Sequence, residues 1–267
     1  AVYGDMTLLH GLQQRRLGAA GGPVELVGQK EVAQRCAGFV FQLSSRLIIY
    51  GKTGHVGGHD VRGELHAAVM AAEDAGTYVM VHVYVPEAIR RAIRAGVKSI
   101  EHGQLIDEPT MKLIAEKGVW LSMQPFIGEG NNHYTNPVQQ AKHELVVQGT
   151  DRAYQLAKKY GVKLAWGTDL LFSPANARNQ NLNIEKMTRW FSNFEILKMI
   201  THDNAELLAL SGRRNPYPGK LGVIEEGALA DLIVVDGNAL EDIKVLTDPG
   251  KNMLLIMKDG KIYKNDL

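Results

Sequence analysis

The stretch YVMVHVYVPEAIRRAIRAGVKSIEHGQL, residues 78–105, decides the fold that we expect for this chain. Two short apolar runs each end in a histidine, His82 and His102, and a segment with helical spacing lies between them. Pro86 in the first turn of that segment and Gly96 after its last turn are typical of the two ends of a helix. The stretch therefore predicts a strand, a crossover helix and a second strand, which is the repeating unit of a parallel sheet.

The same alternation of apolar runs and helical segments continues on both sides of this stretch. The predicted strands are 46–51, 77–84, 97–103, 119–126 and 162–169, and the predicted helices are 61–76, 86–96, 107–118, one ending at 161, and 192–212. The strands are apolar on both faces, as expected for a sheet that helices cover on both sides. Two α/β architectures remain open, a doubly wound sheet and part of a (β/α)8 TIM barrel. No glycine-rich phosphate-binding motif follows a strand, which disfavours the nucleotide-binding forms of the open sheet.

The two ends of the chain have a different texture. Residues 1–45 show no sustained periodicity, although 27–45 is compatible with one helix. After residue 213 a proline- and glycine-containing connector leads to two segments rich in Val, Ile and Leu, 227–238 and 252–265, with Asp-Gly turn dipeptides. We therefore expect an α/β domain over 1–212 and a small β domain over 213–267.

Composition excludes several classes of protein. The 267 residues carry 30 Lys and Arg against 29 Asp and Glu, and no basic block suggests a nucleic-acid partner. No apolar run approaches the roughly 18 residues of a membrane span. The first residues lack the pattern of a signal peptide, so we expect a cytoplasmic protein. The single cysteine, Cys36, excludes an intrachain disulfide and a thiolate cluster and is interpreted as a buried thiol. Metal ligands would thus be His, Asp, Glu or Lys.

Three polar residues fall at the ends of predicted strands. His82, His102 and Asp169 close VMVH, KSIEH and LAWGTD, and the carboxyl ends of parallel strands face one side, where ligands bind. Imidazole and carboxylate are ligands that zinc accepts, and Asp169 could also take the proton of an activated water. However, strand-end histidines are commonly structural and an aspartate commonly caps the next helix. On spacing alone, a metal site and a structural role stay equally open.

From about residue 61 onward the chain resembles the amidohydrolase superfamily, in its imidazolonepropionase-like and prolidase-like branch. The resemblance lies in TYVMVHVYVPEAIRRAIRAGVKSIEHGQLIDEPTMKLIAEKGVWLSMQP, GVKLAWGTDLLF, DNAELLALSG, GKLGVIEEGALADLIVVDGNALEDI and IMKDGKIY. It implies a (β/α)8 barrel with a small β-sandwich. It also implies one or two divalent ions, zinc above all, and hydrolysis of an amide, peptide or ester bond in a small molecule or short peptide. His82 and His102 would be metal ligands, and Asp169 a ligand and the catalytic proton acceptor. A homo-oligomer is compatible with the sequence.

The chain departs from the superfamily pattern at two places. No His-x-His pair occurs, and 168 residues precede Asp169, which is room for about five or six strand–helix units, so we expect an incomplete barrel. Ile48 stands where many relatives carry a bridging lysine. Lys52 would serve only if the strand shifted its register, and a solvated loop lysine is the simpler interpretation. His55 and His59 could substitute as ligands, although two intervening glycines favour exposed loop histidines.

Two further residues are candidates for substrate contact. Tyr84 follows His82 by two residues and would point to the same side of the strand, and Gln124 ends the strand at 119–126. Packing at the mouth of a barrel explains either residue equally well. His202 is interpreted as a packing or helix-end residue.

The sequence thus favours a metal-dependent hydrolase that cleaves an amide or peptide bond in a small substrate, in the manner of a dipeptidase or carboxypeptidase. Because the His-x-His pair is absent, a non-catalytic barrel remnant is the alternative. A metal-free binding module with an open sheet fits the sequence least well.

Overall fold

The fold is described by a computed structural model that covers residues 41–43, 47–50, 61–128, 135–170 and 177–267. The chain separates into two units, 1–37 and 38–267, and the elements below all belong to the second unit. Cys36, Lys52, His55 and His59 lie outside the described residues, so the expectations for their side chains stay untested.

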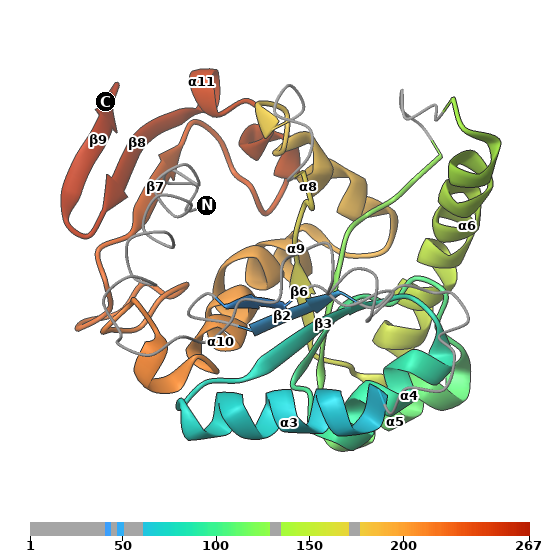
Figure 1. Cartoon of the computed structure of the whole chain (residues 1–267). Coiled ribbons are helices and arrows are strands. Elements are labelled where there is room, and N and C mark those ends of the chain that lie inside the picture. Colours follow the sequence, from blue (N-terminus) through green and yellow to red (C-terminus); the bar gives the residue numbers. More distant parts are fainter. Residues whose placement is uncertain (1–40, 44–46, 51–60, 129–134, 171–176) are drawn as a thin grey trace. The chain divides into compact units, whose positions relative to one another are not determined.

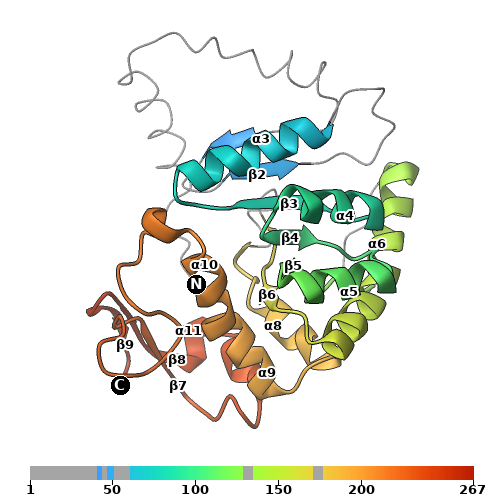
Figure 2. The same cartoon turned by 90° about the horizontal axis from the view of Figure 1, so that it is seen from below.

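A six-stranded sheet forms the centre of this unit (Figures 1 and 2). Its strands, in spatial order, are β1 (Phe41–Leu43), β2 (Leu47–Tyr50), β3 (Val79–Val83), β4 (Ser99–His102), β5 (Trp120–Met123) and β6 (Leu164–Trp166). Neighbours from β2 to β6 pair in parallel, as the alternating pattern predicts, while β1 is antiparallel to β2. The α/β class and the five predicted strands are therefore confirmed.

The helix considered for residues 27–45 is wrong at its carboxyl end, where Phe41–Leu43 form β1. The backbone of this segment pairs with Leu47–Ile49 of β2. An apolar run with aromatic and β-branched residues, FVF at 39–41, favours a strand once a neighbouring strand is available for pairing.

Four helices connect the parallel strands. They are α3 (Val61–Asp74), α4 (Pro86–Ala95), α5 (Glu108–Lys117) and α6 (Pro137–Tyr160). Successive helices contact one another, and Figure 1 shows α3 and α4 along the same side of the strands. Local chemistry explains their ends: α4 begins with proline and ends at Gly96 with φ 98°, and the Asp107 side chain accepts a hydrogen bond from the Thr110 N–H at the start of α5.

The predicted helix at 192–212 is divided into several turns of different geometry. It consists of α9 (Asn193–Lys198), the π-helical turn η2 (Met199–Asp203), α10 (Asn204–Ala209) and the short 3-10 turn η3 (Gly212–Arg214). The elements α8 (Leu182–Lys186) and η1 (Met187–Arg189) precede it. A π turn inserts one residue and so rotates the face that the following helix presents. Apolar periodicity does not reveal such an insertion.

The carboxyl-terminal segment forms a three-stranded antiparallel sheet of β7 (Leu232–Val235), β8 (Met253–Lys258) and β9 (Lys261–Asn265), with η4 (Ile243–Leu246) and α11 (Pro249–Asn252) between β7 and β8. The predicted turn between β8 and β9 is confirmed, with positive φ at both Asp259 and Gly260. The described residues hold one sheet here, so the β-sandwich implied by the resemblance stays a prediction.

The described strands follow an open order, and among them no pairing joins β6 to β1 or β2. Closure into an eight-stranded barrel therefore also stays a prediction.

Ile89, Ile100 and Leu121 are fully buried between the sheet and its helices. Ile243 and Met253 belong to this same core cluster. The domain boundary expected at 212/213 stays a prediction. Within the described residues, no helix combines the length and the apolar character needed to cross a membrane.

Candidate active site

The predicted site residues lie at the carboxyl ends of the parallel strands. His82 lies in β3, His102 is the last residue of β4, Gln124 directly follows β5, and Asp169 follows β6 by three residues. These ends share one edge of the sheet because β3, β4, β5 and β6 run in the same direction. The topology thus carries all four residues to the same edge of the sheet.

His82, His102 and Gln124 are linked in one hydrogen-bonded chain. The Nδ1 atom of His82 lies 2.7 Å from Nε2 of His102, and Nδ1 of His102 lies 2.7 Å from Oε1 of Gln124. An amide oxygen only accepts hydrogen bonds, so the proton of His102 must be on Nδ1. The Nε2 atom of His102 then carries a lone pair and accepts the proton of His82. Gln124 therefore selects the tautomer that presents Nε2 of His102 toward His82.

Backbone geometry explains why the two rings meet. The register of the two strands pairs Val83 with His102, so in regular strands His82 and His102 would point to opposite faces. His102 instead has a φ of 82°, in the left-handed region that non-glycine residues rarely adopt, and Gly103 follows with φ 74°. This change of direction turns the His102 ring toward His82. Such strained backbone is concentrated at functional sites.

The surroundings of His102 hold its ring in one orientation. The residue is 3% exposed, and the Tyr84 ring stacks on it with centroids 4.5 Å apart and planes 8° apart. Gln104, which is 1% exposed, donates a longer hydrogen bond of 3.4 Å to the same Gln124 oxygen. Tyr84, predicted to contact substrate, thus covers one face of His102.

Both imidazoles are held in the neutral form that metal ligands need. Burial lowers the pKa of His82 to about 4, helped by His102 and opposed by Asp169. Burial likewise lowers the pKa of His102 to about 4, and the hydrogen bond to Gln124 opposes this shift. At neutral pH each ring therefore carries one N–H group and one nitrogen with a free lone pair.

Asp169 is close to this chain without being part of it. Asp169 as a whole is exposed to solvent. Its carboxyl group is nevertheless partly removed from water, which raises its pKa, and the nearby His82 ring opposes that rise. Its φ of 51° repeats the left-handed backbone of His102. However, His82, His102 and Asp169 are not, among the described residues, a group of three whose ligand atoms lie close enough together to hold one ion as they stand.

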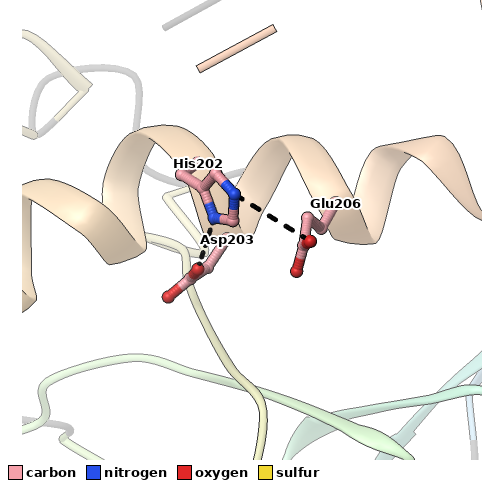
Figure 3. Close-up of side chains that lie close together, drawn as sticks. All are labelled: His202, Asp203 and Glu206. Atoms are coloured by element: carbon pink, nitrogen blue, oxygen red, sulfur yellow. Dashed lines mark hydrogen bonds and ion pairs between the residues drawn. The ribbon is translucent and has the colours of Figure 1, made fainter. Parts of the chain in front are cut away.

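A different group is arranged in this way, namely His202, Asp203 and Glu206 (Figure 3), whose ligand atoms all lie within 4.8 Å of one another. The Nδ1 atom of His202 lies 2.9 Å from Asp203, and its Nε2 atom lies 3.9 Å from Glu206. Asp203 is also paired with the Lys198 ammonium group, which already neutralises its charge. His202 thus lies close to two carboxylates of its own helical segment, and the packing or helix-end role expected for it stays a prediction.

The residues at the strand ends fit a divalent ion. Two nitrogens bound to one tetrahedral zinc ion are roughly 3.3 Å apart, whereas Nδ1 of His82 and Nε2 of His102 are 2.7 Å apart and share the proton of His82. Binding one ion through these two atoms would therefore require the rings to separate slightly and the proton of His82 to leave Nδ1. Gln124 supplies the hydrogen-bond acceptor that metal-binding histidines usually have behind them. Asp169 offers a carboxylate close enough to His82 to shift its pKa.

Sequence reasoning missed Gln104, whose importance depends on contacts far along the chain. In α6, a Cβ added at Gly149 would lie 2.3 Å from the Gln104 carbonyl oxygen. The helix can therefore approach the segment after β4 this closely only because residue 149 is glycine. A glycine inside a helix pattern was the available signal, since it commonly marks close packing.

The parallel sheet and the polar residues at its strand ends define an α/β protein whose candidate site lies at the carboxyl edge of the sheet. The chain belongs to the Amidohydrolase family, whose model matches residues 26–263. The resemblance inferred from the sequence is thereby confirmed.

Among curated proteins, the chain is 33% identical over 205 residues to ochratoxinase from Aspergillus niger. The matched region covers 75% of this chain and 41% of that protein. Among solved structures it is similar to a prolidase in complex with N-methylphosphonate-L-proline, with 32% identity and a TM-score of 0.70 over 83% of this chain and 55% of that one. It is also similar to a Xaa-Pro dipeptidase with methionine bound in the active site, with 31% identity and a TM-score of 0.66 over 80% of this chain and 51% of that one. The chain therefore spans about half the length of these relatives or less.

Proposed function

We propose that this chain carries a metal-dependent active site that hydrolyses an amide or peptide bond in a small substrate. The observation that supports it most is the chain His82–His102–Gln124, in which a buried amide fixes the tautomer of a buried, neutral imidazole. A buried imidazole needs hydrogen-bond partners in any role, and an acceptor behind the ring is also what metal-binding histidines usually have. The relatives named as prolidase, Xaa-Pro dipeptidase and ochratoxinase support a bond of this class.

Each residue has a defined task in this proposal. His82, His102 and Asp169 would hold a divalent ion, and zinc is the ion that suits imidazole and carboxylate best. When bound, such an ion polarises the scissile carbonyl and makes water acidic enough to attack near neutral pH. Asp169 accepts the proton of the attacking water and passes it to the leaving amine. Its raised pKa makes that carboxylate a better proton acceptor than an ordinary aspartate.

The two residues predicted to contact substrate have different surroundings. Gln124 is 5% exposed and bonded to His102, so its amide oxygen is already engaged with a ligand. Tyr84 is half-buried and stacks on His102, which leaves part of its ring accessible at the site. We propose that Tyr84 touches substrate and that Gln124 acts mainly on His102.

The alternative is a remnant that keeps the fold without a working metal centre. It is favoured by the absence of a His-x-His pair, and because His82, His102 and Asp169 do not form a ready-made group of ligands among the described residues. The two possibilities differ in one measurable respect, because only the enzyme turns over a substrate and needs a metal ion to do so.

The test is hydrolysis of a panel of X-Pro dipeptides and N-acyl amino acids by the chain, first stripped with chelator and then supplied with zinc. We expect turnover that chelator abolishes and zinc restores. Asp169→Asn should lower kcat by roughly 10²–10⁴-fold, whereas Asp236→Asn, on an exposed turn, should leave it unchanged. Absence of turnover with every substrate, with or without zinc, would favour the remnant.

A further inference from the structure

Asn204, the first residue of α10, holds the end of β6 with both halves of its side-chain amide. Its Oδ1 atom accepts a hydrogen bond of 2.9 Å from the Trp166 N–H, and its Nδ2 atom donates one of 3.0 Å to the Trp166 carbonyl. A single side chain thus satisfies both backbone groups of one strand residue, as the backbone of a neighbouring strand would. The two residues are 38 positions apart, so the contact is tertiary.

The alternation of the strand explains why Trp166 needs this partner. The Leu121 N–H donates to the carbonyl of Lys163, so the groups of Lys163 and Ala165 point toward β5. Those of Leu164 and Trp166 point to the other side. Trp166 is the last residue of β6, and without Asn204 its N–H and carbonyl would lose these two bonds at a partly buried position.

The π turn gives Asn204 its direction. Residues Met199–Asp203 form η2 immediately before Asn204, and η2 contacts β6. Gly222 also approaches this turn closely, because a Cβ there would lie 2.6 Å from the Thr201 carbonyl carbon and oxygen. The turn therefore packs against both a glycine of the carboxyl-terminal segment and the strand β6. Inserted π turns of this kind are frequent at functional sites.

From these contacts we infer that Asn204 is a positioning residue for Asp169. Only Gly167 and Thr168 separate the held residue, Trp166, from Asp169, whose left-handed backbone leaves it dependent on a fixed strand end. Gly167 also lies beside Gln124, because a Cβ there would be 3.8 Å from the Gln124 amide nitrogen. The two hydrogen bonds between Asn204 and Trp166, called the clamp below, thus set the position of Asp169 relative to the His82–His102–Gln124 chain. The expected effect on catalysis rests on the proposed function. The two hydrogen bonds of the clamp do not depend on it.

The variant Asn204→Ala removes both hydrogen bonds, and Asn204→Asp keeps the acceptor for the Trp166 N–H while removing the donor. Asn193→Ala is the matched control, since Asn193 lies one helix earlier and its amide donates to the carbonyls of Leu240 and Glu241, away from the strand ends. All three proteins are compared with the unaltered chain by thermal unfolding. If Asn204→Ala does not fold, Asn204→Asp provides the same comparison.

The first readout is hydrogen exchange of the peptide 162–169 in metal-free protein, measured by mass spectrometry. We expect faster exchange in the Asn204 variants and unchanged exchange in Asn193→Ala. Equal exchange in all proteins would overturn the clamp, whatever the activity. This readout does not depend on turnover, so a failure of the proposed function and a failure of the clamp are distinguishable.

The second readout is kinetic and applies to the zinc-loaded chain. A displacement of Asp169 should lower kcat by roughly 10–100-fold with KM nearly unchanged, and zinc affinity measured by calorimetry should fall as well. Asn193→Ala should change neither, even where it lowers the unfolding temperature. Normal kcat and zinc affinity in a folded Asn204 variant would overturn the positioning role.

Discussion

The Nδ1 atom of His82 lies 2.7 Å from the Nε2 atom of His102, although the two residues are 20 positions apart in neighbouring parallel strands. The regular register would separate their side chains onto opposite faces, and the left-handed backbone of His102 brings them together. The pair is therefore made by a local distortion that costs on the order of 1–3 kcal/mol. Gln124 then directs the lone pair of His102 into the site.

The role assigned to Gln124 is tested by Gln124→Leu. This change leaves the Nδ1–H of His102 without its acceptor, so the ring is free to change tautomer. We expect zinc affinity to fall by roughly 10–100-fold, measured by calorimetric titration of the metal-free chain.

The alternative that Gln124 touches substrate makes a different prediction for the same variant. A raised KM with normal zinc affinity would contradict the orienting role of Gln124 and support substrate contact. Gln148→Ala, on the exposed side of α6, is a control that should change neither quantity.

The packing of α6 against the segment after β4 is tested by Gly149→Ala. In an ordinary helix this change stabilises a protein by about 1 kcal/mol. At this position the new Cβ would meet the Gln104 carbonyl oxygen at 2.3 Å, which is backbone and cannot turn away. We expect a loss of roughly 1–3 kcal/mol in the free energy of unfolding, measured with urea. A gain in stability would show that the helix moves aside without cost.

The contact between α5 and α6 should depend on pH. Hydrogen bonds from Lys159 and Tyr160 lower the pKa of Glu108 from 4.5 to about 2. Because the unfolded chain binds this proton more tightly, the contribution of Glu108 to stability is present above pH 4.5 and is lost as the pH falls toward 2. The unfolding temperature of the unaltered chain should exceed that of Glu108→Gln at pH 7, and the gap should shrink between pH 4.5 and pH 3.

Glu116→Gln, an exposed change on the same helix, serves as the control for that series. Its unfolding temperature should follow that of the unaltered chain at every pH. A gap between Glu108→Gln and the unaltered chain that stays constant with pH would contradict the assignment.

The sequence was sufficient for the parts of the fold that depend on local patterns. The parallel strands, their helices and the β8–β9 turn follow from apolar spacing, from proline and glycine at helix ends, and from Asp259-Gly260. The ends of the strands then predicted the neighbourhood of His82, His102 and Gln124, because parallel strands share one edge.

The remaining features depend on contacts that periodicity does not encode. The φ of His102 is set by tertiary packing, and the π turn before Asn204 inserts a residue without changing the amphipathic pattern. The strand β1 was missed because pairing with β2 decided a short segment of weak local preference. Asn204 itself carried a weak signal, since asparagine is unfavourable inside a helix and its presence there suggests a specific bond.

The central claim is that His82 and His102 together hold a metal ion, and zinc titration of the chelator-stripped chain tests it most directly. Elemental analysis and calorimetry should give bound zinc for the unaltered chain and for His66→Ala, an exposed histidine on α3. Affinity should fall by at least about 100-fold in a folded His102→Ala variant. Zinc binding that survives His102→Ala and is lost in His202→Ala, or that is absent from the unaltered chain, would contradict the account.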